Sequence, residues 1–427
     1  MTELIVTVNA PGEVAGWLLP LVEHVKQANP GVRIRAVLTP CPFAGGRERQ
    51  ILSAHPALDE VVELGPFLRR ILRRRLPGPA RRKPRASASH PGDAADARSA
   101  AEATVVLHLG GDRLYSLLIA RLLRAPAWVY GTSRRWSRRY ARCLVPNVRA
   151  VEKLKSAGVE AGRIAEVGEM VVDSVPSDLD VAGVVRALGV DPDHDEIVSL
   201  MAGSRPYEVD FMLPFYADLV DDLARRRPSV RCLLPFSEFV DPDLVLRAMA
   251  RAGIQVEADT TPQRVRTRNG ALAHIVRRER YAAMAASRLV VTLPGTNTLQ
   301  LAALGTPMIV AVPLNEVENA VVEGPVNWLS TRWRATRAVK RYLLLRVNRR
   351  LGFIALPNIL AGREVVPELR AVLQPADVAR YVVSWLEDSG GRQAMSRQLR
   401  ELAGPRGAAA RMARELLQAG IPCACGS

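Results

Sequence analysis

Short apolar runs alternate with helix-spaced apolar positions at the start of the chain, and this pattern predicts an α/β fold. Leu4–Val8 is an almost continuous apolar run, typical of a strand buried on both faces. Trp17–Gln27 then places apolar residues at helical spacing, and Val32–Leu38 is a second apolar run. Because a helix connects two consecutive strands, we expect them to lie parallel in one sheet.

The pattern breaks once and then builds a second sheet. Residues 77–103 are rich in Pro, Ala, Ser, Gly and charge, so we predict a disordered insertion there. The later expected strands are Ile197–Met201, Val230–Pro235, Ile254–Glu257, Leu289–Thr292 and Met308–Val312, separated by helices over 207–226, 241–252, 278–286 and 297–304. We therefore expect Rossmann-like domains over 1–170 and 171–385, followed by C-terminal helices and a tail over 386–427.

Composition changes this picture through its charge. The 427 residues carry 59 Lys and Arg against 43 Asp and Glu, a formal net charge of +16. Such a balance favours anionic partners, namely phosphorylated substrates, an anionic membrane or nucleic acid. A GC-rich genome would also favour Arg and Ala without any functional meaning. No recognised nucleic-acid motif accompanies the charge, so nucleic acid is the disfavoured partner.

Two basic segments suggest a place for the membrane. Residues 67–76 and 331–350 interleave Arg and Lys with apolar residues, which is typical of helices that lie on anionic lipid. The alternative is a solvated charged face on a helix packed against its own domain. The N-terminus has no signal-peptide pattern, and no run of about 18 apolar residues occurs. We expect a cytoplasmic protein, peripherally associated with the inner face of the cell membrane.

Two loops carry residues suited to phosphate. Ligands of open α/β sheets bind at the carboxyl ends of strands, so the loops after the apolar runs are the candidates. Gly203-Ser204-Arg205 follows one strand, and a turn containing Gly295, Thr296, Thr298 and Gln300 follows another. Small residues at a helix N-terminus let an anion approach backbone N–H groups. The alternatives are an ordinary helix cap and a surface arginine.

Two carboxylates are candidates for a general base. Asp112 follows the apolar run Val105–Leu109, and Glu13 lies in the first loop of the chain. Either could take the proton from an attacking hydroxyl group. Asp112 could instead serve only as a helix N-cap.

These segments, in this order, resemble lipid-A-disaccharide synthase. The matching blocks are Gly12-Glu13-Val14-Ala15-Gly16; Gly203-Ser204-Arg205 with Glu208; Gly295 to Gln300 followed by Leu304-Gly305-Thr306-Pro307-Met308; and Leu356-Pro357-Asn358 with Ala361-Gly362-Arg363-Glu364 and Val366-Pro367-Glu368. The family pattern is altered at Ala15, Trp17, Glu169, Pro294 and Gln300.

The resemblance implies a GT-B architecture, with two doubly wound Rossmann-like domains facing across a cleft. Residues 1–170 would bind the acceptor and residues 171–385 the nucleotide sugar. The implied reaction is an inverting transfer from a UDP-sugar to a lipid-linked or glycolipid acceptor at the membrane surface, within lipid A biosynthesis and without a metal or other cofactor. The family's catalytic Asp falls on Asp112, and its donor-binding positions fall on Ser204, Arg205, Thr296, Gln300 and Asn358.

Three other functions remain open at this point. The chain could be a UDP-sugar 2-epimerase of the same architecture, or a glycosyltransferase with a soluble acceptor. It could also bind a UDP-sugar without turning it over. Release of UDP in the presence of a lipid acceptor separates these possibilities.

Overall fold

The computed structural model describes residues 1–41, 46–75, 104–191, 194–257, 263–315 and 334–418, which form two compact units. Unit 1 comprises Met1–Ser174 together with Pro405–Ser427, and unit 2 comprises Val175–Gly404. The predicted insertion at 77–103 lies outside the described residues. Each unit has a sheet with helices packed on it, which is the predicted α/β class.

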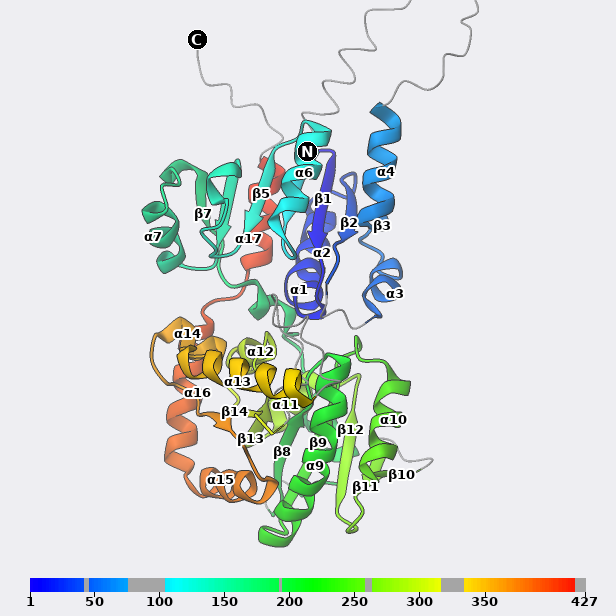
Figure 1. The fold of residues 1–427 in the computed structure, drawn as a ribbon, viewed down its shortest axis with the longest axis vertical. Coiled ribbons are helices and arrows are strands. Elements are labelled where there is room, and N and C mark those ends of the chain that lie inside the picture. The colour runs from blue at the N-terminus through cyan, green and yellow to red at the C-terminus, as the bar shows by residue number, and fades with distance from the viewer. Residues whose placement is uncertain (42–45, 76–103, 192–193, 258–262, 316–333, 419–427) are drawn as a thin grey trace, which may run out of the picture. The chain divides into compact units, whose positions relative to one another are not determined.

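Unit 1 is built on a seven-stranded sheet in the order β3-β2-β1-β4-β5-β6-β7, with every neighbouring pair parallel (Figure 1). Its strands are β1 (Glu3–Val8), β2 (Arg33–Leu38), β3 (Glu60–Glu63), β4 (Thr104–His108), β5 (Ala127–Tyr130), β6 (Arg142–Val145) and β7 (Ile164–Glu166). Every residue of β4 is buried, as expected for a central strand covered on both faces.

The helical segments of unit 1 follow its strands. They are α1 (Pro11–Glu13), the π-helix η1 (Val14–Leu18), α2 (Leu19–Ala28), α3 (Glu48–Ser53), α4 (Leu64–Arg75), α6 (Arg113–Leu123), η2 (Ser137–Arg139), α7 (Val148–Ser156), η3 (Ala161–Arg163), η4 (Met170–Ser174) and α17 (Ala408–Gln418). The helix predicted over 17–27 therefore begins within the π-helix η1. A Cβ atom on Gly16 would lie 3.2 Å from Val171 of η4, so η1 and η4 pack closely here.

The last two helices of the chain, α16 and α17, belong to different units. Asp173 accepts hydrogen bonds from the backbone N–H groups of Gly407 and Ala409, each at 2.7 Å, and Arg411 donates to the carbonyl oxygen of Val167 at 2.7 Å. These bonds join α17 to unit 1, whereas residues up to 404 belong to unit 2. The expected single C-terminal segment 386–427 is thus split between the units, because α17 packs on α2 and η4 of unit 1, whereas α16 packs on helices of unit 2.

Unit 2 contains an eight-stranded sheet in the order β10-β11-β12-β9-β8-β13-β14-β15. Its strands are β8 (Glu196–Met201), β9 (Val230–Pro235), β10 (Gln255–Val256), β11 (Gln263–Arg266), β12 (Leu272–Val276), β13 (Leu289–Thr292), β14 (Met308–Pro313) and β15 (Glu368–Ala371). β10, β11 and β12 pair antiparallel, unlike the rest of the sheet. The sequence pattern missed β11 because only Val265 in that strand is buried, which leaves no apolar run.

The helices of unit 2 are α8 (Val181–Ala187), α9 (Pro206–Arg226), α10 (Pro242–Ala252), α11 (Arg280–Ala286), α12 (Asn297–Leu304), α13 (Arg334–Arg350), α14 (Leu356–Ala361), α15 (Pro375–Glu387) and α16 (Ser389–Ala403). α9 packs against the sheet, and the hydroxyl group of its Tyr216 donates to the carbonyl oxygen of Met201 in β8 at 3.1 Å. The core of unit 2 gathers side chains from β8, β9, β13, α9, α10 and α15.

Helix α4 contradicts the prediction that the apolar residues of 67–76 face a membrane. Phe67 is 1% exposed and Ile71 is 6% exposed, and both belong to the core of unit 1. Arg70 donates to Glu60 of the same unit at 2.5 Å. Here the structure favours the alternative, because Phe67 and Ile71 face the core of unit 1 while Leu72, Arg69 and Arg73 are exposed.

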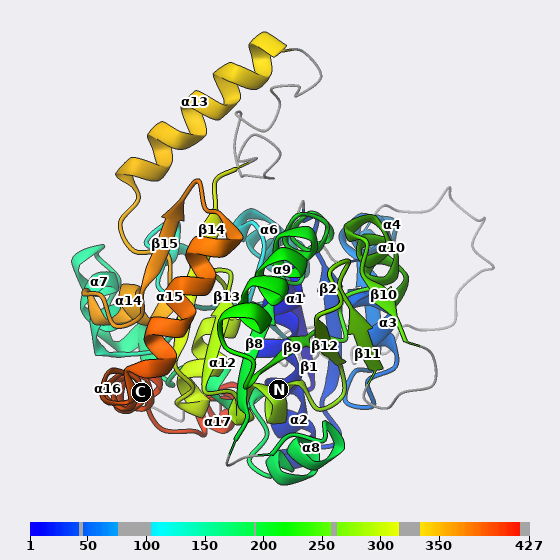
Figure 2. The same cartoon turned by 90° about the horizontal axis from the view of Figure 1, so that it is seen from below.

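Helix α13 differs, because it projects from the body of unit 2 (Figure 2). Val339, Tyr342 and Val347 are at least half exposed, alongside exposed Arg346 and Arg350. At about 100° per residue, Arg346 falls in the same sector as Val339, so these exposed apolar and basic side chains do not form separate faces. Within the described residues, no helix is long and apolar enough to cross a membrane.

Candidate functional site

The two candidate bases lie at the switch point of unit 1. β1 and β4 are neighbours, and the chain builds outward from them in opposite directions, through β2 and β3 on one side and β5 to β7 on the other. The backbone N–H of Gly110, just after β4, donates to the carbonyl oxygen of Thr7 in β1 at 3.1 Å. A switch point is where open α/β sheets bind ligands.

The Glu13 side chain stabilises the first loop through hydrogen bonds to its backbone. Its Oε2 atom accepts hydrogen bonds from the backbone N–H groups of Asn9 at 3.3 Å and Ala10 at 3.2 Å. A Cβ atom on Gly110 would lie 1.7 Å from the same oxygen, so only glycine allows this approach. The structure therefore brings Glu13 against the loop that carries Asp112.

Asp112 is the N-cap of α6, as the alternative interpretation expected. Its Oδ1 atom accepts from the backbone N–H of Leu114 at 2.9 Å. The residue is exposed, so its carboxylate is accessible from solvent. A cap uses one oxygen, and a general base needs only one more, so the two roles are compatible.

Next to Asp112, the buried residue His108 carries a neutral imidazole. Burial, with a contribution from nearby Arg113, lowers the pKa of His108 to about 3, so its imidazole is neutral near pH 7. Its Nδ1 atom is hydrogen-bonded to Thr7 Oγ1 at 3.1 Å. Arg113 donates to the carbonyl oxygens of Ser133 and Arg135, which fixes the loop after β5.

Three residues at this edge were not identified as site residues from the sequence. Trp17 packs edge-on against Tyr130, with ring centroids 5.5 Å apart, and the Tyr130 hydroxyl donates to the carbonyl oxygen of Gly168 at 3.0 Å. Burial raises the pKa of Glu169 above its usual value. Trp17 Nε1 and Asn9 Oδ1 are buried and have no hydrogen-bond partner within the described residues. The only sequence signals were the changed family positions at Trp17 and Glu169.

The two phosphate-suited loops flank the corresponding point of unit 2. β8 pairs in parallel with β13, with Met201 opposite Thr292 at the carboxyl ends. β9 continues the sheet on one side of this pair and β14 on the other. The loop with Ser204 and the turn with Gly295 therefore leave adjacent strand ends. The sequence predicted that each loop follows a strand, but not that the two strands are neighbours.

Arg205 is oriented by Glu208 in the first of these loops. Its Nη1 atom donates to the Tyr207 hydroxyl at 3.0 Å and to Glu208 Oε1 at 3.3 Å, while Glu208 Oε2 accepts from the backbone N–H groups of Ser204 and Arg205. Burial raises the pKa of Glu208, and Arg205 and the two N–H groups oppose that rise. The result is a partly exposed guanidinium in a fixed position beside Ser204.

In the turn before α12 and its first residues, some polar side chains are buried and others are exposed. Thr296 is the N-cap residue and is partly exposed, whereas Thr298 is fully buried and donates to the carbonyl oxygen of Gly295 at 2.7 Å. Gln300 is 7% exposed, and its amide donates to the Tyr281 hydroxyl at 3.0 Å. Thr298 thus holds the turn, which contradicts its expected contact with the nucleotide. What remains at the surface is the helix N-terminus, an anion-binding feature in itself.

Comparison with known proteins covers this part of the chain. The sequence model of the lipid-A-disaccharide synthetase family matches residues 163–324. The lipid-A-disaccharide synthase of Burkholderia pseudomallei is 29% identical over 246 residues, 57% of this chain and 52% of the relative. That of Paraburkholderia xenovorans is 27% identical over 261 residues, 61% of this chain and 56% of the relative. This part of the chain is similar to the lipid-A-disaccharide synthases. The chain spans about half the length of the curated relatives that it matches.

Solved structures share the fold at low sequence identity. Anabaena HepE, determined in complex with UDP and glucose, is 14% identical with a TM-score of 0.50 over 98% of this chain and 99% of its own. The UDP-GlcNAc 2-epimerase of Neisseria meningitidis, bound to UDP-GlcNAc, is 12% identical with a TM-score of 0.54 over 97% of this chain and 100% of its own. Both support the GT-B fold for this chain.

The block most typical of lipid-A-disaccharide synthase has a structural role at Asn358. This residue is 0% exposed. Its Nδ2 atom donates to the carbonyl oxygen of Val366 at 2.8 Å and to Glu368 at 2.9 Å, and its Oδ1 atom accepts from the N–H groups of Val365 and Val366. The expected contact between Asn358 and the donor is therefore wrong, because every polar atom of its side chain is used inside unit 2.

A second pair near the donor turn was missed from the sequence. Arg280 lies over the ring of Tyr281, 4.5 Å from its centroid, and donates to its hydroxyl at 2.8 Å. The Tyr281 hydroxyl also accepts a hydrogen bond from the side-chain amide of Gln300. No sequence signal distinguishes Arg280, the first residue of α11, from the neighbouring arginines of this segment.

Proposed function

We propose that this protein is an inverting glycosyltransferase that moves a sugar from a UDP-sugar to a lipid-linked acceptor. The observation that carries the proposal is the pairing of Ser204-Arg205 and the 295–297 turn at adjacent strand ends of the unit 2 switch point. Charge-assisted hydrogen bonds and a helix N-terminus are what a nucleoside diphosphate needs there. The kinship with lipid-A-disaccharide synthases supports the same donor class.

In the proposed reaction, an acceptor hydroxyl attacks the anomeric carbon of the sugar. The new C–O bond forms on one face as the bond to the diphosphate breaks on the other, and UDP leaves with that electron pair. Arg205 and the N-terminus of α12 would stabilise the negative charge that grows on the diphosphate. No metal ion is part of this proposal.

Asp112 is the proposed base, and Glu13 is proposed to position its loop. Glu13 and Glu208 hold the same local geometry: each is the third residue of the first helix after a switch-point strand. Each accepts N–H hydrogen bonds from the N-cap residue and the residue before it. Glu208 organises a loop in the other unit, and the same structural role would account for Glu13 without a part in proton transfer. Asp112 is exposed and uses one carboxylate oxygen in the helix cap, so it stays the proposed base.

Replacing Arg205 with Ala tests the donor site. We expect UDP binding to weaken by about 1.5–3 kcal/mol, roughly 10- to 150-fold, because a charge-assisted hydrogen bond is lost. Isothermal titration calorimetry with UDP measures the change. Arg247→Ala removes an exposed arginine from α10 of the same unit and serves as the matched control. Equal UDP affinity for Arg205→Ala and the wild type would remove this loop from the donor site.

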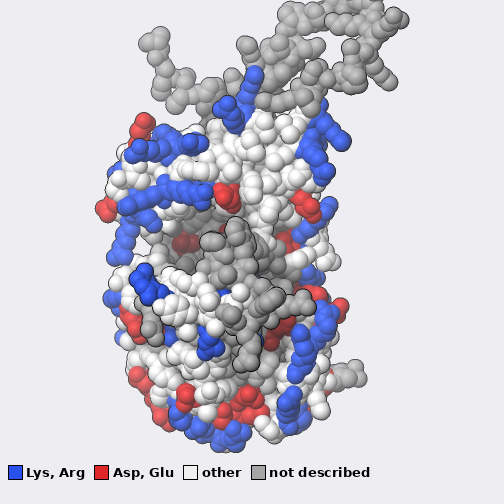
Figure 3. All heavy atoms as spheres, viewed as in Figure 1, with Lys and Arg blue, Asp and Glu red and all other residues white. Residues whose placement is uncertain are grey.

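We also propose that α13 brings the protein to an anionic membrane, so that a lipid-linked acceptor is accessible. The support is the exposure of Val339, Tyr342 and Val347 on a projecting helix that also carries exposed arginines. Each basic residue near an anionic surface contributes about 1 kcal/mol. Figure 3 shows Lys and Arg in patches across the visible face rather than in one stripe, so charge alone does not locate the surface.

Charge reversal in α13 tests this membrane contact. The double variant Arg337→Glu/Arg346→Glu should reduce co-sedimentation with phosphatidylglycerol vesicles by roughly 30-fold or more, from at least about 2 kcal/mol of lost attraction. Added salt should weaken wild-type binding because it screens surface charge. Arg69→Glu/Arg73→Glu on α4 is the control, with the same change of net charge. If both double variants lose binding equally, α13 is not the membrane contact.

A further inference from the structure

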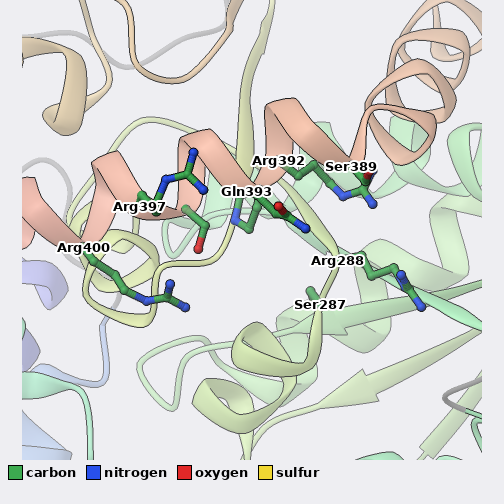
Figure 4. A pocket seen from close by; sticks show the side chains of 9 residues that line it. Ser287, Arg288, Ser389, Arg392, Gln393, Arg397 and Arg400 are labelled. Atoms are coloured by element: carbon green, nitrogen blue, oxygen red, sulfur yellow. The ribbon is translucent and has the colours of Figure 1, made fainter.

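An arginine-lined pocket opens in unit 2, away from the proposed donor site (Figure 4). It encloses about 490 Å³, within the range of small-ligand sites. Arg288 and Pro307 line it and come immediately before β13 and β14, so the pocket lies at the amino ends of these strands. Ser204 and the 295–297 turn follow the carboxyl ends, at the opposite edge of the same sheet.

Four guanidinium groups from two separate segments share this pocket. Arg288 comes from the connection between α11 and β13, and Arg392, Arg397 and Arg400 come from α16. None of the nine described residues that line it is Asp or Glu. Burial lowers the pKa of Arg392 and nearby Arg288 adds to this effect, while the Glu196 and Asp388 carboxylates oppose it. Positive charges gathered without a lining carboxylate favour an anion between them.

Packing fixes the wall that carries three of these arginines. Ser396 of α16 donates to the carbonyl oxygen of Gly305 at 2.6 Å, and the Sδ atom of Met395 accepts from the N–H of Met308 at 3.3 Å. On the other wall, the hydroxyl of buried Ser287 donates to the carbonyl oxygen of Ala283 at 2.8 Å. Both walls are therefore held by the core, which keeps a site preorganised.

Helix capping accounts for only part of the cluster. Arg392 donates to the carbonyl oxygens of Trp385 and Leu386 at the end of α15, and Arg400 lies against Gly305 at the end of α12. Cations at helix C-termini are stabilising in themselves. Arg288 and Arg397, however, are exposed, and within the described part of the chain their guanidinium groups make no hydrogen bond or ion pair. Capping gives no reason for these two to line the same pocket.

We propose that this pocket binds a phosphate or diphosphate group, at a second anion site distinct from the donor site. The guanidinium fork matches the oxygens of a phosphate group in pairs, which a single point charge does not. Ser389, at the start of α16, adds a hydroxyl group to the lining. The phosphate could belong to a soluble molecule or to a lipid headgroup, and both would meet the same side chains.

The test titrates the full-length chain with inorganic pyrophosphate while saturating UDP occupies the donor site. We expect pyrophosphate to bind, and the double variant Arg288→Gln/Arg397→Gln to weaken that binding about 100-fold or more, at tenfold or more for each lost charge-assisted bond. UDP affinity should be unchanged in this variant. Arg186→Gln/Arg247→Gln removes two exposed arginines elsewhere in unit 2 and should bind pyrophosphate as the wild type does.

A parallel experiment separates the two sources of phosphate. Vesicles of phosphatidylcholine with phosphatidic acid replace pyrophosphate, and the same two double variants are compared. Binding to these vesicles alone, lost in Arg288→Gln/Arg397→Gln, supports the site with a lipid phosphate as its ligand. Unchanged affinity of that variant for both probes overturns the proposal, as does the absence of wild-type binding to either. These readouts do not depend on glycosyl transfer, so failure of the proposed function is distinguishable.

Discussion

Replacing Asp112 with Asn is expected to reduce glycosyl transfer by about 10²–10⁴-fold, the usual cost of losing a general base. Asparagine is also a good N-cap, so the hydrogen bond to the N–H of Leu114 and the start of α6 should be preserved. UDP affinity should change little, because the proposed donor loops belong to unit 2. The assay is release of UDP from a UDP-sugar in the presence of a bacterial glycolipid extract.

Glu13→Gln is the matched comparison for this experiment. A glutamine oxygen can still accept from the N–H groups of Asn9 and Ala10, so the loop should keep its shape and turnover should fall less than for Asp112→Asn. Near-normal turnover in Asp112→Asn, together with loss of turnover in Glu13→Gln, would show that Glu13 is the base instead. Normal turnover in both variants would contradict base catalysis by either carboxylate.

Replacing Asn358 with Ala is expected to destabilise unit 2 by about 2–5 kcal/mol. The change leaves the N–H groups of Val365 and Val366 without their acceptor and removes a donor from Glu368. Buried polar groups that lose their partners cost about 1–3 kcal/mol each, and large effects of single substitutions come from such networks. The midpoint of urea unfolding measures this loss.

A neighbouring position provides the control for Asn358. Ile359 is 50% exposed on the same helix, so Ile359→Ala should shift the unfolding midpoint much less. UDP affinity of the folded Asn358→Ala protein should match the wild type, because no atom of this side chain is available to a ligand. Wild-type stability combined with loss of UDP binding would instead restore Asn358 to the donor site.

The comparison of Asn358 with Arg205 shows where prediction from sequence succeeds. Arg205 follows the apolar run of β8, and an apolar run locates the end of a buried strand without knowledge of the rest of the fold. Asn358 came from a motif alone. A motif marks a residue that matters, but it does not say whether the residue contacts a ligand or holds the chain together. Only the four hydrogen bonds to Val365, Val366 and Glu368 decide this.

The amphipathic segments show the same limit. Both α4 and α13 combine arginines with apolar residues, and their sequences alone do not separate them. Phe67 and Ile71 are buried on α4, whereas Val339 and Tyr342 are exposed on α13. The difference lies in whether a sheet is present beneath the helix, which local sequence does not encode.

The sequence by itself determined the α/β class, most of the strands, and the loops that carry Glu13, Asp112, Arg205 and the 295–300 turn. It could do so because strand and helix periodicities are local, and because parallel strands place their ligand loops at one edge. Tertiary structure decided that these loops pair at two switch points and that α17 joins unit 1. It also decided that Asn358 is internal and that Arg288 meets the arginines of α16. Each of these depends on contacts between segments far apart in the chain, and their free energy comes from packing that no local pattern contains.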